Sequence, residues 1–231
     1  MMSGEKFDFR QFSVRQERCA MKVGTDGVLL GSWACCNADY EPLRVLDVGT
    51  GTGLIALFLA QRFPNAQVIA IDIDPDAVAQ ARDNFLSSPF ANRLTAIGQS
   101  LQDMKTDKAF DAIVCNPPFF TDSLLCPDSK RTMARHTKTL TFAELARCSS
   151  RLLTDRGTLS VIIPSERKSD MEAEAIFSGF STSRTCFVKT KETKPAKRVM
   201  LEFSKCQNHT ENENLVLGDE KYVSLTRNFY L

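Results

Sequence analysis

Residues 43–53 have the sequence LRVLDVGTGTG, and the apolar run LIALFLAQRF follows at residues 54–63. The apolar and β-branched residues of 43–48 predict a strand, and the run after the glycines predicts a helix. The glycines between them let the backbone approach a ligand closely, at the N-terminus of the coming helix. Strand, glycine-rich turn and helix in this order predict half of a nucleotide-binding α/β unit.

The spacing of the glycines separates two classes of cofactor. The dinucleotide fingerprint G-x-G-x-x-G requires a glycine at position 54, where this chain has Leu54. The third glycine is Gly53 instead, and an aspartate precedes the first glycine by two residues. This D-x-G-x-G-x-G pattern resembles motif I of the class I S-adenosylmethionine-dependent methyltransferases. The resemblance implies that S-adenosylmethionine is the cofactor and that its motif I residues are Asp47, Gly49, Thr50, Gly51 and Gly53.

An acidic residue, Asp72, ends the second predicted strand, residues 67–72. It lies 19 residues past Gly53, a distance at which an acidic side chain meets a ribose in such folds. We therefore expect Asp72 to contact the cofactor, whereas Asp74 precedes a proline and is expected to cap the next helix. Many methyltransferases of this class also carry an aspartate after the third strand, where this chain has Ser100. The adenine contact is left to Gln99, Ser100 or a backbone group.

The fourth predicted strand, residues 110–115, is followed by Asn116-Pro117-Pro118-Phe119. Open α/β sheets bind their ligands at this end of the strands. Since the prolines have no N–H group, the side-chain oxygen of Asn116 and the carbonyl of Pro117 are predicted to accept hydrogen bonds from an amino group. Phe119 is placed to stack on a flat base. A Pro-Pro pair alone more often marks a turn.

The tetrapeptide resembles the [N/D/S]-P-P-[F/Y/W] signature of methyltransferases that act on planar nitrogen. Together with KVGTDGVLLG at residues 22–31 and the Ala134-Arg135-His136 tripeptide, it resembles the bacterial tRNA adenine-N6 methyltransferase family, whose members modify the adenine beside the anticodon of a valine tRNA. The resemblance implies that Asn116, Pro117, Pro118 and Phe119 are catalytic and that Asn116 also borders the cofactor.

Two other methyltransferase classes share the signature. Ribosomal-RNA guanine-N2 methyltransferases also have phenylalanine at its fourth position. Release-factor glutamine methyltransferases usually have tyrosine there and carry a separate helical N-terminal domain, whereas only about 40 residues precede the first strand here. A binding module without activity is expected to have lost one of the two motifs, and both are present.

The resemblance implies an α/β, Rossmann-like class I methyltransferase fold with a mostly parallel seven-stranded sheet, an antiparallel closing strand and helices on both faces. We expect residues 1–40 to form an arm or hairpin and a helix packed on the core. Residues 41–206 are expected to form the methyltransferase domain, and residues 207–231 a tail or edge strand. The segments 180–190 and 197–206 predict an antiparallel pair.

Charge points to RNA as the partner. The formal net charge is only +1, but basic residues gather in segments 128–138 and 184–205, a distribution typical of proteins that bind phosphate-rich partners. The residues expected to contact tRNA are Lys130, Arg131, Arg135, Lys191, Lys194, Lys197 and Arg198.

The remaining composition excludes several classes. Eight cysteines include no C-x-x-C pair and the chain has two histidines, so no metal site is predicted. The longest apolar run, residues 54–60, is far shorter than a membrane span. We expect a cytoplasmic monomer that does not bind a membrane.

Overall fold

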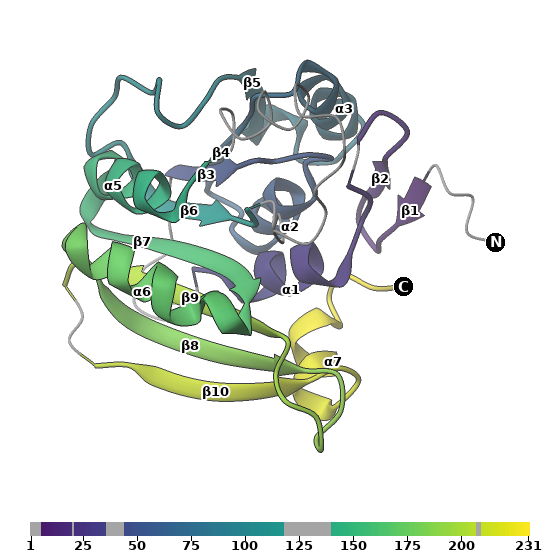
Figure 1. The fold of residues 1–231 in the computed structure, drawn as a ribbon. Coiled ribbons are helices and arrows are strands. Elements are labelled where there is room, and N and C mark those ends of the chain that lie inside the picture. Colours follow the sequence, from purple (N-terminus) through teal and green to yellow (C-terminus); the bar gives the residue numbers. More distant parts are fainter. Residues whose placement is uncertain (1–5, 20, 36–43, 118–139, 207–208) are drawn as a thin grey trace, which may run out of the picture.

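The computed structural model describes residues 6–19, 21–35, 44–117, 140–206 and 209–231. Its main sheet has eight strands in the order β10-β8-β9-β7-β6-β3-β4-β5 (Figure 1). The strands are β3 (Arg44–Val48), β4 (Gln67–Asp72), β5 (Leu94–Gly98), β6 (Phe110–Cys115), β7 (Leu153–Pro164), β8 (Ser181–Lys189), β9 (Arg198–Ser204) and β10 (Glu211–Val216). All pairings are parallel except those of β9, which runs antiparallel between β7 and β8.

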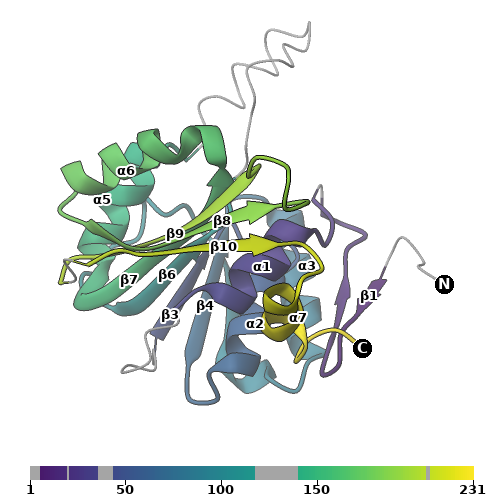
Figure 2. The same cartoon turned by 90° about the horizontal axis from the view of Figure 1, so that it is seen from below.

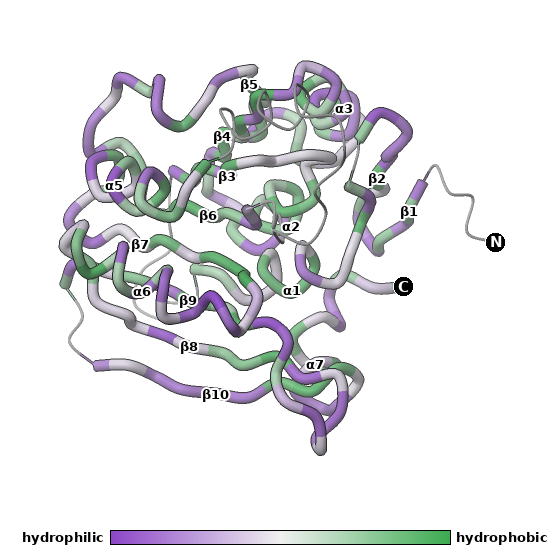
Figure 3. Tube along the Cα trace, viewed as in Figure 1, coloured by the Kyte–Doolittle hydropathy of each residue, from purple (hydrophilic) through white to green (hydrophobic). Residues whose placement is uncertain are grey.

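The predicted mostly parallel sheet with an antiparallel closing strand is confirmed, but the predicted number of seven strands is wrong. The eighth strand is β10, which pairs in parallel with β8 at the edge of the sheet. Its sequence, ENENLV, is largely polar, so apolar patterning does not reveal it. Backbone pairing and the single buried side chain of Leu215 suffice at an edge that is hydrophilic along most of its length (Figure 3). Residues 207–231, expected to form a tail or an edge strand, thus contain this edge strand, and a helix at Glu220–Thr226 follows it.

Helices cover both faces of the sheet, as predicted (Figure 2). One face packs against α1 (Thr25–Trp33), α2 (Leu54–Arg62), α3 (Pro75–Leu86) and α7 (Glu220–Thr226). The other packs against α5 (Phe142–Leu152) and α6 (Lys168–Phe177). Short 3-10 turns lie at Ala91–Arg93 and Ser165–Arg167. The apolar core therefore has two layers separated by the sheet.

The N-terminal arm forms a small hairpin of β1 (Lys6–Asp8) and β2 (Ser13–Arg15). Two of its phenylalanines, Phe9 and Phe12, are buried against Phe58 of α2, with ring centroids 5.1 and 5.8 Å away. Phe229 stacks on the same ring at 4.0 Å. Both ends of the chain are thus fastened to one helix of the core.

Local signals in the sequence predict several helix starts correctly. The side chain of Asp74 accepts a hydrogen bond from the backbone of Asp76 and caps α3. Thr141 and Glu144 form a reciprocal capping box at the start of α5. In contrast, α1 begins at Thr25 with Gly24 as its N-cap, and no side chain caps it.

Candidate active site

Four parallel strands end side by side at one edge of the sheet. Val48 of β3 lies opposite Ile71 of β4 and Cys115 of β6, and Asp72 of β4 lies opposite Gly98 of β5. The residues that follow these strands therefore meet at this carboxyl edge. A cavity of about 860 Å³ opens there, lined by residues from every one of these strand ends. Cavities of this size accommodate small ligands and cofactors.

Residues 49–52 of the glycine loop, 49–53, line one side of the cavity, whereas Gly53 does not line it. The loop's backbone N–H groups at Gly49 and Thr50 both donate to the carbonyl of Ile71, which fixes the loop to β4. Gly53 has a φ of +83°, and a Cβ on it would lie 2.5 Å from Cε1 of Phe85, so only glycine fits this close approach. Gly51, with a φ of +53°, borders the cavity and has no atom within 4 Å of where a Cβ would lie. This leaves a backbone cradle open to a ligand.

Asp72 lines the cavity and braces its walls. Its Oδ2 accepts a hydrogen bond from the N–H of Gly51 at 2.9 Å, and its Oδ1 accepts one from the N–H of Asp74 at 3.0 Å. Each carboxylate oxygen has a further lone pair, since a carboxylate offers about four acceptor positions. The side chain is therefore held in place and can still accept hydrogen bonds from a diol in the cavity.

Asp47 is fully buried behind the glycine loop and does not line the cavity. Its Oδ2 accepts a hydrogen bond from the hydroxyl of Thr50 at 2.6 Å, and its Oδ1 has no hydrogen-bond partner among the described residues. Burial raises the pKa of Asp47 to about 7, against the opposing effect of the Thr50 hydrogen bond and with a smaller contribution from the negative charge of Asp72. Asp47 thus contacts the loop through Thr50.

Asn116 lines the cavity directly after β6, across from the glycine loop on neighbouring β3. Its Oδ1 is buried and has no hydrogen-bond partner in the described part of the chain. A buried amide oxygen without a partner carries a desolvation cost that an incoming donor relieves. Pro117 is buried beside it. Pro118 and Phe119, the other two predicted catalytic residues, lie outside the described residues, as do Lys130, Arg131 and Arg135.

Both candidates for the adenine contact, Gln99 and Ser100, line the cavity. The Ser100 hydroxyl donates to Oδ2 of Asp103 at 2.6 Å, and its oxygen accepts from the backbone N–H of Asp103 at 3.2 Å. The amide nitrogen of Gln99 donates to the carbonyl of Asp103 at 3.1 Å. The turn after β5 is thus organised around Asp103, which the sequence did not single out.

Two other segments reach the cavity. The N-terminus of α1 contributes Gly24, Thr25, Asp26 and Gly27, so this end of the helix faces the cavity while the helix packs on the sheet. The N-terminal arm contributes Cys19, Met21 and Lys22. The signal for α1 was the glycine before its N-terminus, but the path of the arm depends on long-range contacts that no local pattern predicts.

Neither thiol in the cavity is prepared to act as a nucleophile. Burial raises the pKa of Cys115 well above its usual range. Burial also raises the pKa of Cys19 to about 11, with Asp72 adding to the shift. Both cysteines therefore remain protonated near neutral pH. No cluster of potential metal ligands is found among the residues that the structure describes.

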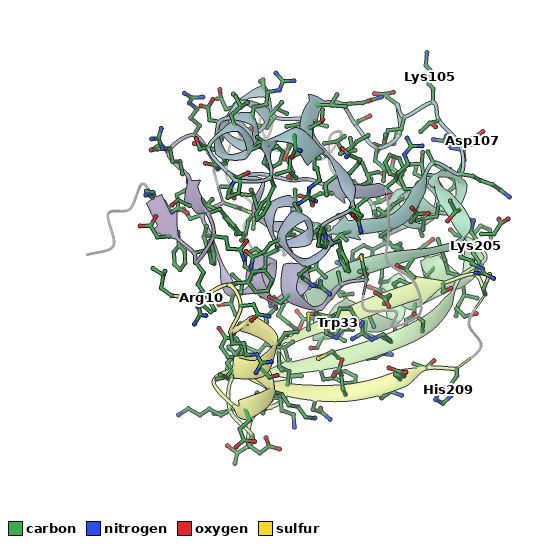
Figure 4. The ribbon with its side chains drawn as sticks, turned by 180° about the vertical axis from the view of Figure 1, so that it is seen from behind. Arg10, Trp33, Lys105, Asp107, Lys205 and His209 are labelled. Atoms are coloured by element: carbon green, nitrogen blue, oxygen red, sulfur yellow. The ribbon has the colours of Figure 1, made fainter. Side chains whose placement is uncertain are left out.

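The basic segment 184–205 does not form one surface. Arg184 is only 15% exposed, stacks over Trp33 at 4.1 Å and pairs with Glu202 and Glu213. Lys205 donates to the carbonyl of Ser150 and lies on the same side of the molecule as Asp107 (Figure 4). The other basic residues expected to contact tRNA in this segment lie in or next to the turn between β8 and β9.

That β8–β9 turn lies at the carboxyl edge because Arg198, the first residue of β9, pairs with Pro164, the last residue of β7. Lys191, Lys194 and Lys197 are exposed in it. The guanidinium of Arg198 donates to Asp26 at 2.8 Å, and Asp26 lines the cavity. Of the four residues expected to contact tRNA in this turn, Arg198 bonds to a residue that lines the cavity, and the three lysines are exposed at the same end of the sheet; none of the four lines the cavity itself.

Comparison with known proteins places these features in context. Residues 37–187 match the family model described as "Methyltransferase small domain". A protein of Phocaeicola vulgatus named tRNA1(Val) (adenine(37)-N6)-methyltransferase is 45% identical, and the alignment covers 100% of this chain and 99% of that protein. A protein of Flavobacterium psychrophilum with the same name is 40% identical, with 97% and 99% covered.

Solved structures show the same fold at low sequence identity. A predicted O-methyltransferase of Agrobacterium tumefaciens superposes with a TM-score of 0.68 at 18% identity, covering 88% of this chain and 96% of the other. A putative RNA methyltransferase of Pyrococcus horikoshii superposes with a TM-score of 0.54 at 19% identity, covering 78% and 83%. Both confirm the Rossmann-like methyltransferase architecture predicted from the sequence.

Proposed function

This chain belongs to the methyltransferase small domain family, and we propose that it transfers a methyl group from S-adenosylmethionine to N6 of adenine 37 in a valine tRNA. Two observations support the proposal. The Oδ1 of Asn116, which has no hydrogen-bond partner among the residues that the structure describes, borders the same cavity as the glycine loop, and the full-length relatives carry this activity in their names. Since tRNA is the proposed substrate, we also propose that the enzyme acts in the cytoplasm.

The cavity has the donor and acceptor groups that S-adenosylmethionine requires. We propose that the glycine loop, residues 49–53, approaches the amino-acid part of the cofactor and that Asp72 accepts from its ribose hydroxyls. Gln99 and Ser100 are the side chains available to its adenine. Asp47 does not contact the cofactor but acts indirectly, by accepting the hydrogen bond that holds Thr50 in the loop. The cofactor supplies an electron-poor methyl group bound to a sulfonium.

On the acceptor side, we propose that Asn116 and Pro117 hold the exocyclic amine of adenine. The lone pair of such an amine is delocalised into the ring, so it is a poor nucleophile. Acceptors at the Asn116 Oδ1 and the Pro117 carbonyl stabilise the N–H groups more strongly as positive charge develops on nitrogen, which is binding selective for the transition state. The proton can then leave to water, so no strong base is needed. Phe119, which follows Pro118, is proposed to stack on the target base.

The tRNA is proposed to bind over the β8–β9 turn. Lys191, Lys194 and Lys197 of this turn are exposed at the same end of the sheet as Asn116. Arg198 joins the turn to Asp26, which lines the cavity. Cations at this place neutralise phosphates next to a base in the active site. A base in the anticodon loop is unpaired, which lowers the cost of presenting it. Arg184 and Lys205 are excluded from this surface by their contacts.

Methyl transfer from labelled S-adenosylmethionine to unmodified valine tRNA tests the proposed reaction. Nucleoside digestion should place the label in N6-methyladenosine, and a matched tRNA with guanine at position 37 should accept none. Label in N2-methylguanosine would instead support the guanine-N2 class. In a parallel assay with a release-factor protein, label in that protein and none in tRNA would support the glutamine class. Either of these two results would overturn the proposed substrate.

A further inference from the structure

The N-terminal arm forms a wall of the cofactor cavity, although it precedes the methyltransferase motifs in sequence. Cys19, Met21 and Lys22 line the cavity opposite the strand ends. The side-chain oxygen of Gln16 accepts a hydrogen bond from the backbone N–H of Val23 at 2.8 Å. This bond joins Gln16, before the lining residues of the arm, to Val23, after them.

Asn84 of α3 connects this arm to the glycine loop. Its Oδ1 accepts from the backbone N–H of Arg15 at 2.9 Å, and its Nδ2 donates to the carbonyl of Arg15 at 2.9 Å and to the carbonyl of Thr52 at 2.8 Å. The residue is only 1% exposed. One side chain thus pairs both backbone groups of an arm residue and one carbonyl of the cofactor loop.

A second residue on the same face of α3, one turn earlier, also holds the arm. Gln80 is 2% exposed, and its Oε1 accepts from the backbone N–H of Arg18 at 3.1 Å. The ion pair of Arg18 with Asp83 is about half exposed on both sides, so it adds little. The polar contacts that hold residues 15–18 on α3 are therefore chiefly those of two buried amides, and β2 runs beside α3 (Figure 1).

We propose that Asn84 and Gln80 are positioning residues for the cofactor, and this inference rests on the proposed cofactor site. Neither residue lines the cavity. They act by fixing two of its walls, the arm and the glycine loop, to the same helix. Sites are precise when the groups that form them are supported by buried hydrogen bonds of this kind. Loss of Asn84 releases both walls together and weakens cofactor binding.

The chemistry at position 84 requires an amide. Asn84 donates two hydrogen bonds and accepts one, and a carboxylate of the same shape only accepts. Asn84→Asp therefore keeps the volume and the bond from the Arg15 N–H but turns the two donations into repulsion of carbonyl oxygens. Gln80→Ala removes only the bond to the Arg18 N–H, so its effect has the same direction and is smaller.

Calorimetric titration of the full-length protein with S-adenosylhomocysteine, without RNA, tests the inference. We expect Asn84→Asp to raise the Kd about tenfold, because buried carbonyls at both walls lose their partner. Trypsin supplies a second readout, since Arg15, Arg18 and Lys22 are cleavage sites in the arm. Saturating S-adenosylhomocysteine should slow cleavage at these sites in the wild type, and Asn84→Asp should accelerate it.

Ser183→Ala is the matched control. Ser183 is fully buried in β8, away from the cavity, and its hydroxyl donates to the carbonyl of Glu202 at 3.0 Å. This variant should lower the melting temperature without changing the Kd. Equal Kd values for the wild type, Asn84→Asp and Gln80→Ala would overturn the positioning role. Failure of the wild type to bind S-adenosylhomocysteine would overturn the cofactor site itself. If Asn84→Asp does not fold, Gln80→Ala decides the question by the same two readouts.

Discussion

Arg198 and Asp26 are joined by a hydrogen bond of 2.8 Å from Nε of the arginine to Oδ2 of the aspartate. The bond links the start of β9 to the first turn of α1, so the β8–β9 turn is fastened to the rim of the cavity. The side chains are 36% and 28% exposed, and an ion pair this open to solvent contributes at most about 1 kcal/mol. Its importance lies in where it places charge rather than in stability.

Because the two residues carry opposite charges at one edge, their substitutions should change RNA affinity in opposite directions. Arg198→Gln removes a cation, and we expect weaker tRNA binding and a slope of log Kd against log salt reduced by about 0.7. Asp26→Asn removes an anion and should leave the affinity unchanged or higher. Fluorescence anisotropy over a range of salt concentrations measures both. An equal loss of affinity in the two variants would show that the pair acts by positioning α1.

Replacing Lys191, Lys194 and Lys197 together by glutamine should weaken tRNA binding more strongly. Loss of three phosphate contacts is expected to reduce the salt slope by roughly 2 and to leave the Kd for S-adenosylhomocysteine unchanged. The matched control replaces Lys105, Lys108 and Arg156, which are exposed at the opposite edge of the sheet. This control removes the same charge. A similar loss in the control would mean that total charge, and not the β8–β9 turn, determines affinity.

Arg184 should behave as a structural residue. It lies over the ring of Trp33 and beside Glu202, which is only 2% exposed. Arg184→Gln leaves that buried carboxylate with the backbone N–H of Cys35 and the hydroxyl of Ser160 but without its cation. We expect the free energy of unfolding in urea to fall by about 2 to 4 kcal/mol, with an unchanged salt slope for tRNA. A smaller salt dependence of tRNA binding together with an unchanged free energy of unfolding would show that Arg184 contacts RNA.

The contrast between Lys191 and Arg184 shows what sequence can predict here. Local features are recoverable because they depend on neighbours in sequence: the glycine loop after β3 and the Asp74 cap form as predicted, and the Thr141 capping box also involves only residues three apart. Charge clustering along the chain is different. Clustering along the sequence groups Arg184 with the lysines of the β8–β9 turn. Only the folded structure shows that the Arg184 guanidinium pairs with Glu202 and Glu213 instead.

The same limit applies to the cavity. Asp72 ends one predicted strand and Asn116 follows another, so the parallel register brings both to the same cavity as expected. Asn84 lies in the last turn of α3, where the default position of an asparagine is the surface, and no motif marks its contact with Arg15, which is 69 residues away. The wall formed by the arm therefore becomes visible only in the folded chain.

Stability should depend on pH through Asp47. Its pKa is raised to about 7 in the folded protein, chiefly by burial, against about 4 in the unfolded chain. Between these values the folded state binds a proton that the unfolded state lacks, so this residue lowers stability as pH rises from about 4 to 7, and the loss is complete above 7. Asp47→Asn removes the titrating group. The free energy of unfolding of Asp47→Asn minus that of the wild type should rise by about 2 kcal/mol from pH 5 to pH 8, measured by urea unfolding. An unchanged difference would show that Asp47 is ionised throughout this range.

Asn116 should matter for transfer and not for cofactor binding. Asn116→Ala removes an acceptor proposed to act as charge develops on the amine, and we expect kcat to fall by about a hundredfold or more. The Kd for S-adenosylhomocysteine should change by less than about threefold, since the glycine loop and Asp72 remain. Asn116→Asp keeps an acceptor oxygen and should retain more activity than the alanine variant. Asn92→Ala, at an exposed position after α3, is the control. Normal turnover in Asn116→Ala, measured with saturating tRNA, would remove this residue from the mechanism and leave the Pro117 carbonyl as the remaining proposed acceptor of the amine.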